Sequence, residues 1–420
     1  MIWKIARREV LEAILTGRSA LLGAIAVAVL GTGLFVMNRD YQTRRANYDL
    51  IRPESDQPIA VAAPNPLSVF ARGLDDAMGR SFEVNVIGVN IGSSQAAANP
   101  LFGLFPTPDW SYLFRVVFAL VAFIFGFDLI CAEKERGTLK LMVANGASRG
   151  EIAAGKWLGG WFAFMIPIGL AVVLWLTLSR PVFGLVLSSA QWTRVLLFLA
   201  LTGIYLTVCY TIAVAISTFF HRSATALVAA LFVWLVLVFV VPSFGVLAAR
   251  QIAHVRPLAL VTAERNRIFG SEMIKAYEEA RANPGSSPFQ RHWAEMHRQG
   301  DVVSQRVAAE VGALARTSAA LVRISPAGAY DAISTHTLGT SVVDEARLKL
   351  DVRRHKNSIL PDVFEQTGSR AEATYPAFVV SRASLGEVLA AGRADLSAMV
   401  ITGVLALLVL FVTVNRYDIR

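Results

Sequence analysis

Six long apolar blocks dominate the pattern of hydrophobic and polar positions along the chain. A helix needs roughly 20 apolar residues to cross the hydrocarbon layer of a membrane. Its backbone groups must pair within the helix, because no water is available to them there. The pattern therefore predicts an all-α polytopic membrane protein with six transmembrane helices. These predicted helices cover residues 20–37, 112–131, 157–179, 195–220, 224–247 and 396–414.

Residues 1–19, which precede the first block, have the pattern of an amphipathic interfacial helix. Ile2, Ala6 and Val10 stand four apart and share one helix face, whereas the charged side chains lie mostly elsewhere around the helix. Such a helix suits the membrane surface. The alternative interpretation is a plain cytoplasmic extension of the first span. The first block is too long for the apolar region of a signal peptide, so we expect a retained anchor.

Two long stretches between the apolar blocks are predicted to lie outside the bilayer. Residues 38–111 are rich in Pro, Asn and Gly, and within them residues 82–91 alternate roughly with a period of two, as in a strand. Residues 248–395 carry helical patterns at 257–282 and 289–324. We expect this second stretch to form a mostly helical extracytoplasmic domain, because it is long enough to build a core of its own.

The positive charges of the short loops set the expected orientation, because Lys and Arg favour the cytoplasmic side. Residues 1–19 before the first span and residues 38–52 after it carry four each, so they do not decide the orientation. Loop 132–156 holds five and the tail 415–420 holds two, and both lie on the N-terminal side of the membrane if there are six spans. Loop 180–194, on the other side, holds only two. We therefore place both termini in the cytoplasm and the two long stretches outside.

Composition supports the membrane interpretation and excludes several others. Hydrophobic residues make up 55% of the chain and charged residues only 17%, which no soluble protein of this size could bury. The net charge of +9 is spread over loops and helix ends without aromatic interleaving, so we expect no nucleic-acid partner. The two cysteines, Cys131 and Cys209, fall in or beside predicted spans, which excludes a disulfide framework or a cysteine metal site.

The charged loop at 132–156 carries the most information about function. Gly137 offers a break, Thr138 can cap a new helix, and Leu139 begins the apolar face of that helix. A short helix across the cytoplasmic mouth of two spans would let a membrane domain receive force from a soluble motor. An ordinary amphipathic turn at the interface fits the same periodicity, which by itself leaves both interpretations open.

The sequence of this loop closely resembles the coupling-helix region of type-2 ATP-binding-cassette (ABC) transporter permeases. The resemblance rests on residues 133–139, 148–152 and 155–156, and it extends to other parts of the membrane core. Those other parts are residues 6–9, 17–19, 107–110 and 415–420. The long extracytoplasmic loops are similar to those of the subgroup that includes the gliding-motility and nitrous-oxide-reductase-maturation permeases.

The resemblance implies an exporter in the bacterial cytoplasmic membrane, surrounded by lipid and built as a dimer with a second copy or a paralogue. A separate ABC ATPase subunit would hold ATP and Mg, so no cofactor is expected on this chain. The outer domain could instead transmit the ATPase stroke to an extracytoplasmic partner. The residues that the resemblance places at or near the ATPase are Glu133, Glu135, Arg136, Gly137, Thr138 and Leu139, with a second contact at the turn of His221 and Arg222. His221 is equally well explained as a polar residue at headgroup depth.

Two patterns imitate catalytic or metal sites. Residues 150–156 match a phosphate-binding loop, but Trp157 stands where the magnesium-binding Ser or Thr should be and no strand precedes the loop. His292 and His297 are five apart, whereas a helical zinc site needs its two histidines one turn apart. We expect a solvated helix face there. A membrane-anchored sensor or hydrolase remains a weaker alternative, because no constellation of the kind a site needs is visible.

Ionisable residues inside a predicted span are costly and are therefore functional candidates. Arg115 could reach outward to the membrane surface, which we favour, or face the dimer centre and bind anionic cargo. Asp128 could pair with Lys134 or with a neighbouring subunit. Gly155 and Gly159 have a spacing that permits close contact with another helix.

Overall fold

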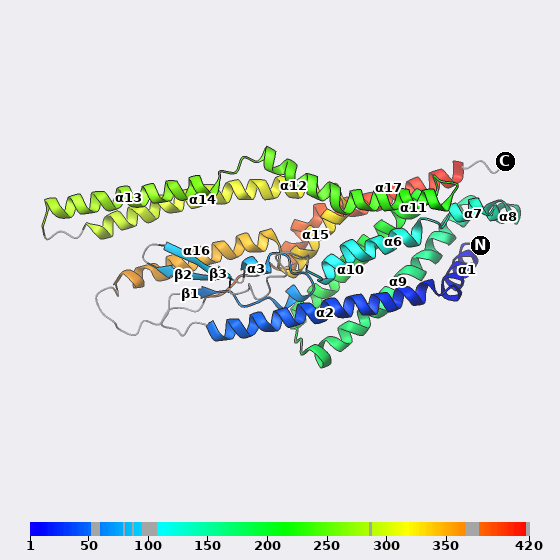
Figure 1. Ribbon diagram of the computed structural model, residues 1–420, viewed down its shortest axis with the longest axis horizontal. Helices are drawn as coiled ribbons and strands as arrows, with labels where there is room; N and C mark the ends of the chain where they lie inside the picture. The colour runs from blue at the N-terminus through cyan, green and yellow to red at the C-terminus, as the bar shows by residue number, and fades with distance from the viewer. Residues whose placement is uncertain are drawn as a thin grey trace. The chain divides into compact units, whose positions relative to one another are not determined.

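The computed structural model describes residues 1–51, 59–78, 80–85, 88–94, 107–284, 288–365 and 378–416. In these residues the chain is helical apart from one small antiparallel sheet (Figure 1). The chain divides into two units, the first formed by residues 1–241 and 323–420 and the second by residues 242–322. The expected predominantly helical membrane fold is therefore confirmed.

Six helical segments within the described residues are long and apolar enough to cross a membrane. They are Arg18–Leu50, Trp110–Glu135, Arg149–Phe183, Ser189–Ser217, Ser223–Ile252 and Leu385–Arg416. The first, α2 (Arg18–Ile51), is 34 residues long and so measures about 51 Å, well beyond the roughly 30 Å of hydrocarbon that it must cross. Each predicted block lies inside one of these segments, except that the fourth was expected to continue to residue 220.

The second span is assembled from several helical pieces. They are α5 (Trp110–Tyr112), the π-helical η2 (Leu113–Phe118), α6 (Ala119–Gly126) and α7 (Cys131–Glu135). Asp109 caps the first piece, because its carboxylate accepts the backbone N–H of Tyr112 at 2.7 Å. In η2, the hydroxyl of Tyr205 donates a hydrogen bond to the carbonyl of Arg115 at 2.9 Å.

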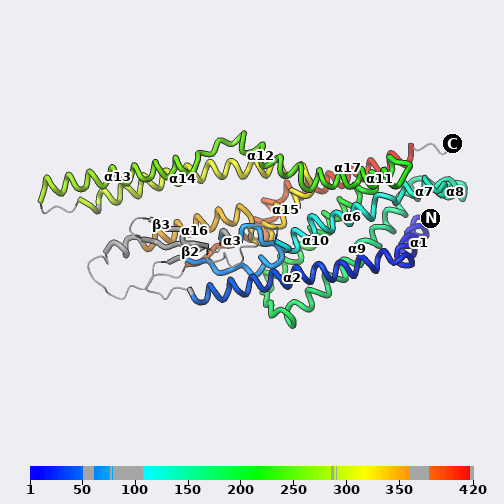
Figure 2. The backbone as a smooth tube through the Cα atoms, viewed as in Figure 1, coloured from blue at the N-terminus to red at the C-terminus, as the bar shows by residue number. Residues whose placement is uncertain are grey.

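The core of the first unit is aromatic. The helices that enclose it are α2, α6, α9 (Arg149–Phe183), α10 (Ser189–Ser217), α15 (Pro326–Leu338) and α17 (Leu385–Arg416). Trp110 donates its indole N–H to the carbonyl of Leu30 at 3.0 Å, and Tyr205 stacks on Tyr330 with ring centroids 4.5 Å apart. Figure 2 shows the backbone course of α2 and α9, which pack against each other.

The expected outer stretch 248–395 is divided between the two units. Its helix α15 belongs to the unit that contains the spans and packs against α10 and α17 (Figure 1). Ser325 caps α15, Pro326 occupies its first turn, and the hydroxyl of Tyr330 bonds to that of Thr202 at 2.8 Å inside the core. The helix α16 (Val342–Glu365) follows in the same unit.

The small sheet lies in the expected outer stretch 38–111. Strands β1 (Ile59–Val61), β2 (Arg80–Asn85) and β3 (Gly88–Ser94) pair antiparallel in that order, with Phe82 opposite Ile91. The strand suggested for residues 82–91 is thus two paired strands, and residues 86–87 between them lie outside the described residues. The short helices η1 (Pro66–Val69) and α3 (Asp75–Met78) lie between β1 and β2 in the sequence.

The second unit is built on a helical hairpin. Helices α13 (Leu258–Ala282) and α14 (Phe289–Val322) pack against each other along their length, close to the bounds that the sequence pattern predicts. The fifth span is formed by α11 (Ser223–Leu235), η3 (Val236–Val240) and α12 (Val241–Ile252) in succession. The second unit begins at Pro242 and therefore includes nearly all of α12.

Candidate coupling site

The loop at 132–156 folds into a short helix between two sharp turns. Helix α7 ends before Gly137, which has φ 72°, a left-handed conformation that favours glycine. Helix α8 (Thr138–Ala144) then begins, and Ser148 opens α9 with a capping box that it forms with Glu151. The break thus lies at Gly137 as the sequence suggests. Gly137 itself is the capping residue, and Thr138 instead donates its hydroxyl to the Glu133 carboxylate.

A buried lysine connects three elements at this site. The ammonium of Lys156 at the start of α9 lies 2.8 Å from Glu9 Oε2 on α1 (Ile2–Leu15) and 2.9 Å from Glu133 Oε1 on α7. Only 4% of the Lys156 side chain is exposed. Burial raises the pKa of Glu9 above its usual range, an effect that Lys156 opposes. The lysine that the phosphate-loop pattern singled out is therefore an ion-pair partner of two carboxylates.

The expected close helix contact of Gly155 and Gly159 is found, and the partner is α1. A Cβ on Gly155 would lie 2.8 Å from Ile5 Cβ, and one on Gly159 would lie 2.6 Å from the carbonyl oxygen of Ala6. The absence of side chains at these two positions lets α1 approach α9 closely enough for Glu9 to reach Lys156. Glu9 and Lys156 were not among the predicted site residues. The glycine spacing beside a lysine that opens a span was the signal that could have found them.

Helix α7 is also bound to the turn between the fourth and fifth spans. The carboxylate of Glu135 accepts the backbone N–H of Ser223 at 2.9 Å and its hydroxyl at 2.6 Å, so that it caps α11. Lys134 donates to the carbonyl of Thr218. The two contact regions predicted from the resemblance, the coupling loop and the turn of His221 and Arg222, are therefore brought together in the structure.

The short helix α8 has an inner and an outer face. Leu139 is buried in a small apolar cluster with Ala147 and Ile152, which anchors the helix. On the outer face, Lys140 is exposed and 63% of Leu141 is exposed. The predicted interface residues Glu133, Thr138 and Leu139 thus serve contacts within the chain. The exposed ones are Glu135, Arg136, His221 and Arg222.

A family model described as ABC-2 family transporter protein matches residues 3–292. The chain belongs to the ABC-2 transporter family. Members are membrane subunits without an ATPase site of their own, and the family implies an ABC ATPase partner and a dimeric assembly. The match includes α1, the coupling site and five of the six spans of this ABC-2 permease. No match is found among curated proteins.

Arg115 and Asp128, the two ionisable residues of the predicted second span, have partners inside the chain of the permease. A guanidinium nitrogen of Arg115 lies 2.7 Å from Asp331 Oδ1 on α15, so Arg115 pairs across the bundle, which neither of the two interpretations anticipated. Asp128 accepts hydrogen bonds at 3.4 Å from both terminal nitrogens of Arg18, where Lys134 or a neighbouring subunit was expected. Sequence reasoning missed these partners because they lie far away along the chain.

The permease also contains a Ser–His–Asp grouping, which bears on the hydrolase alternative. Ser341 Oγ lies 3.2 Å and Asp344 Oδ2 lies 3.5 Å from the same atom, His336 Nδ1. A catalytic triad needs the serine and the carboxylate on opposite ring nitrogens. Ser341 instead donates its hydroxyl to Asp344 at 2.6 Å at the start of α16, which makes the group a helix cap.

His292 and Glu295, from the histidine pattern on α14, have partners within the hairpin of the permease. His292 bonds to carboxylates of α13, whereas Glu295 pairs with Arg298 on its own helix at 2.6 Å. Among the residues that the structure describes, no group of three or more His, Cys, Asp and Glu side chains is placed to hold a metal ion. Cys131 and Cys209 are free and buried.

Proposed function

We propose that this ABC-2 permease is the membrane subunit of an ATP-driven exporter in the bacterial cytoplasmic membrane, with both termini in the cytoplasm. A separate ATPase subunit would hydrolyse ATP and push on α8. The observation that carries the proposal is the outer face of α8, where Lys140 and Leu141 are exposed on a helix whose inner face is anchored by Leu139. An exposed apolar side chain beside a cation, on a short helix between two spans, offers a contact surface to a soluble subunit.

The contacts of the coupling site suggest how a push would spread. Glu133 binds to Lys156, which lies in the third span and also binds Glu9 of α1. Glu135 caps α11, which begins the fifth span. A displacement of α7 and α8 would therefore reach α1, α9 and α11 together. These ion pairs and the helix cap connect α7 directly to α1, α9 and α11, without an intervening loop.

The dimer partner would be a second copy or a paralogous chain. Helices α11 and α17 carry large apolar side chains that face outward, including Phe232 and Leu408. Surfaces of this kind suit lipid or a second permease equally.

The proposal is tested by purifying the permease together with the ATPase encoded next to it. In the Leu141→Asp variant, we expect the ATPase to be lost from the purified complex, because a charge replaces the apolar side chain. The matched control is Val379→Asp, since Val379 is similarly exposed but lies in the segment before α17. An ATPase that never accompanies the wild-type permease, or that binds both variants equally well, contradicts the proposal.

A second candidate function is transmission of the ATPase stroke to an envelope partner, and the length of α2 favours it. About 20 Å of this helix extends beyond the hydrocarbon layer. Its outer part is fixed by Arg44, which donates to Asp40 at 2.9 Å and to Ser68 at 2.9 Å and also pairs with Asp75. These four side chains are buried, so the helix and the segment that contains η1 and α3 form one stiff piece.

Crosslinking in cells separates the two candidates. A photoreactive residue at the exposed position Val311 on α14 should capture one defined envelope protein if the stroke is transmitted. The capture should also depend on an active ATPase. Capture that is unchanged when the ATPase is inactivated, or no capture at all, argues for export alone.

A further inference from the structure

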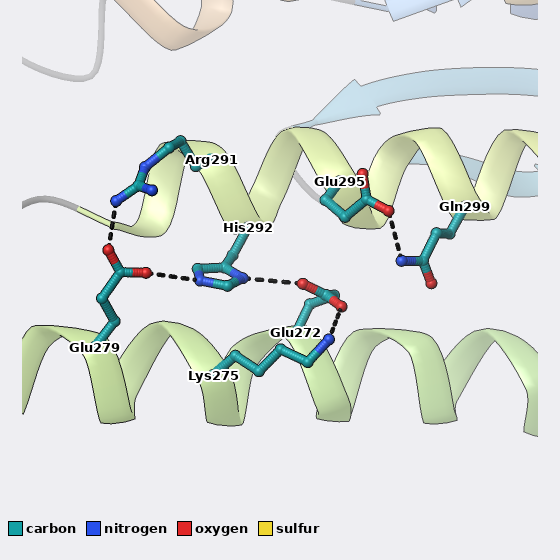
Figure 3. A pocket seen from close by; sticks show the side chains of 7 residues that line it. All are labelled: Glu272, Lys275, Glu279, Arg291, His292, Glu295 and Gln299. Atoms are coloured by element: carbon teal, nitrogen blue, oxygen red, sulfur yellow. Dashed lines mark hydrogen bonds and ion pairs between the residues drawn. The ribbon is translucent and has the colours of Figure 1, made fainter.

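His292 joins the two helices of the hairpin in the second unit. Its ring lies between two carboxylates of α13, with Nδ1 2.9 Å from Glu272 Oε2 and Nε2 3.1 Å from Glu279 Oε2 (Figure 3). Glu272 is only 3% exposed, and His292 is itself largely covered. Both ring nitrogens of one histidine on α14 are thus used by one neighbouring helix.

The geometry is satisfied only by the protonated ring. A neutral imidazole has one N–H and one lone pair, whereas an imidazolium has two N–H donors. Ionised carboxylates only accept hydrogen bonds. With a neutral ring, one of the two glutamates would face a lone pair at hydrogen-bond distance, which is repulsive.

Among the charged groups around the ring, Glu272 and Glu279 have the largest effect on its protonation. On α13, Lys275 pairs with Glu272 at 2.6 Å, and on α14 Arg291 pairs with Glu279, but both cations are exposed to water. Glu295 lies away from the ring and bonds to Gln299 (Figure 3). It also accepts hydrogen bonds from Arg298. Hydrogen bonding to Glu272 and Glu279 raises the pKa of His292, and the same bonds lower the pKa of each glutamate.

Little apolar contact competes with these bonds along the seam between α13 and α14. The buried apolar residues of the hairpin are Val261, Ala276, Met296 and Val303, and aromatic contacts join Phe269 to Trp293 and Tyr277 to Phe289. A pair of helices with so small a core depends on its polar contacts to stay closed. Ala276 and Met296 lie one helical turn from Glu272 and His292, so the ring and its two carboxylates add polar contacts to one part of this small core.

We propose that His292 is a proton-operated clasp, which holds α13 and α14 together when the ring is protonated and loosens the hairpin when the ring is neutral. The inference goes beyond the proposed transport function and does not need it. The proposed topology decides only which compartment's pH the hairpin would report, and that compartment would be the extracytoplasmic one.

The direction of the pH dependence follows from the raised pKa. Stabilisation by the clasp is fully present below the ordinary histidine pKa of about 6.5 and is lost as the pH rises through the higher value of the folded protein. The hairpin is therefore expected to be tight in mildly acidic conditions. It loosens in the neutral to mildly alkaline range.

Distances between spin labels in the full-length permease test the clasp. The labels are placed by Ser271→Cys on α13 and Ala294→Cys on α14, both exposed positions, whereas the native Cys131 and Cys209 are buried. Between pH 5 and pH 9, we expect the distance distribution to change from narrow to broad, with its midpoint above about 6.5. The measurement needs neither ATP nor a partner, so its result is independent of the transport proposal.

Three variants test whether protonation of His292 causes the change in distance. His292→Gln, which has one donor group and one acceptor, should give a broad distribution at every pH. His292→Arg, which stays charged, should remain narrow at every pH. The matched control Glu295→Gln should keep the wild-type transition, because Glu295 bonds to Arg298 and Gln299. A wild-type distance that does not change with pH, or a transition that persists in His292→Gln, overturns the proposal.

Discussion

The ammonium of Lys156 lies 2.8 Å from the carboxylate of Glu9, although 147 positions separate the two residues in the sequence. This contact fixes the surface helix α1 on the first turns of α9. The second carboxylate on the same ammonium belongs to Glu133, so α1 and the coupling loop share one cation. The three side chains therefore act as one structural group.

Removal of the shared cation should be costly. Lys156→Met would leave two carboxylates close together in a mostly buried site, and breaking a buried ion pair in this way costs about 3–5 kcal/mol. We expect a much lower thermal unfolding midpoint for the purified variant in detergent. The exposed Lys140→Met is the matched control and should unfold like the wild type. Adding Glu9→Gln and Glu133→Gln to this variant should restore most of the lost stability. If the unfolding midpoint does not recover, the ion-pair explanation is wrong.

The close contact between α1 and α9 can be tested with two glycines of the same helix. A Cβ on Gly159 would meet the backbone of Ala6, whereas one on Gly169 would meet nothing within 4 Å. Gly159→Ala should therefore destabilise the protein by about 1–3 kcal/mol, as overpacking does. Gly169→Ala should leave stability unchanged or raise it slightly, because alanine favours helices. Equal thermal unfolding midpoints for the two variants would mean that α1 does not pack on α9.

Asp109 should make stability depend on pH. Burial raises the pKa of Asp109 to about 6, although it accepts the backbone N–H groups of Arg72 and Tyr112. A raised carboxyl pKa means that stability falls as the pH rises from about 4 to about 6, by up to about 3 kcal/mol for this group. The unfolding midpoint of the wild type should fall relative to that of Asp109→Asn over this range. Asp49→Asn, at an exposed position, is the matched comparison, and a difference of the same size there would contradict the role given to Asp109.

The pair between Arg115 and Asp331 should couple the second span to α15. A double-mutant cycle with Arg115→Met and Asp331→Asn should give a coupling free energy of about 1 kcal/mol, because the rest of the protein covers both side chains only in part. The exposed pair of Arg45 and Asp49, whose charged atoms are 4.0 Å apart, is the comparison and should give nearly zero. Equal coupling energies in the two cycles would show that Arg115 does not depend on Asp331.

The membrane core was predictable because its signal is local. An apolar block of about 20 residues has few other structures available to it, so the six spans could be placed from the sequence alone. The break at Gly137 was likewise local, since a glycine followed by a helix-forming run is a recognisable stop and start. The coupling loop and the two hairpin helices were located for the same reason.

The contacts that tie these elements together could not be predicted, because each depends on residues far apart in the sequence. Arg18 meets Asp128 across 110 positions, and Lys156 meets Glu9 across 147. Helix α15 was assigned to the outer domain because Ala327, Gly328 and Ala329 are small and give no apolar block. They are buried because Tyr330, on the same helix, packs against residues that lie far away along the chain.

The π-helical turn in the second span has a consequence for the rotation of that span. A π turn adds one residue to the helical repeat, so the parts before and after it are set at angles that a regular α-helix would not allow. The part before the turn can direct Trp110 toward α2 while the part after it keeps Phe123 in the core. The hydroxyl of Tyr205 holds a carbonyl of this turn. Deletion of a single residue from 113–118 would therefore swing one end of the span by about 100° and separate its two sets of contacts.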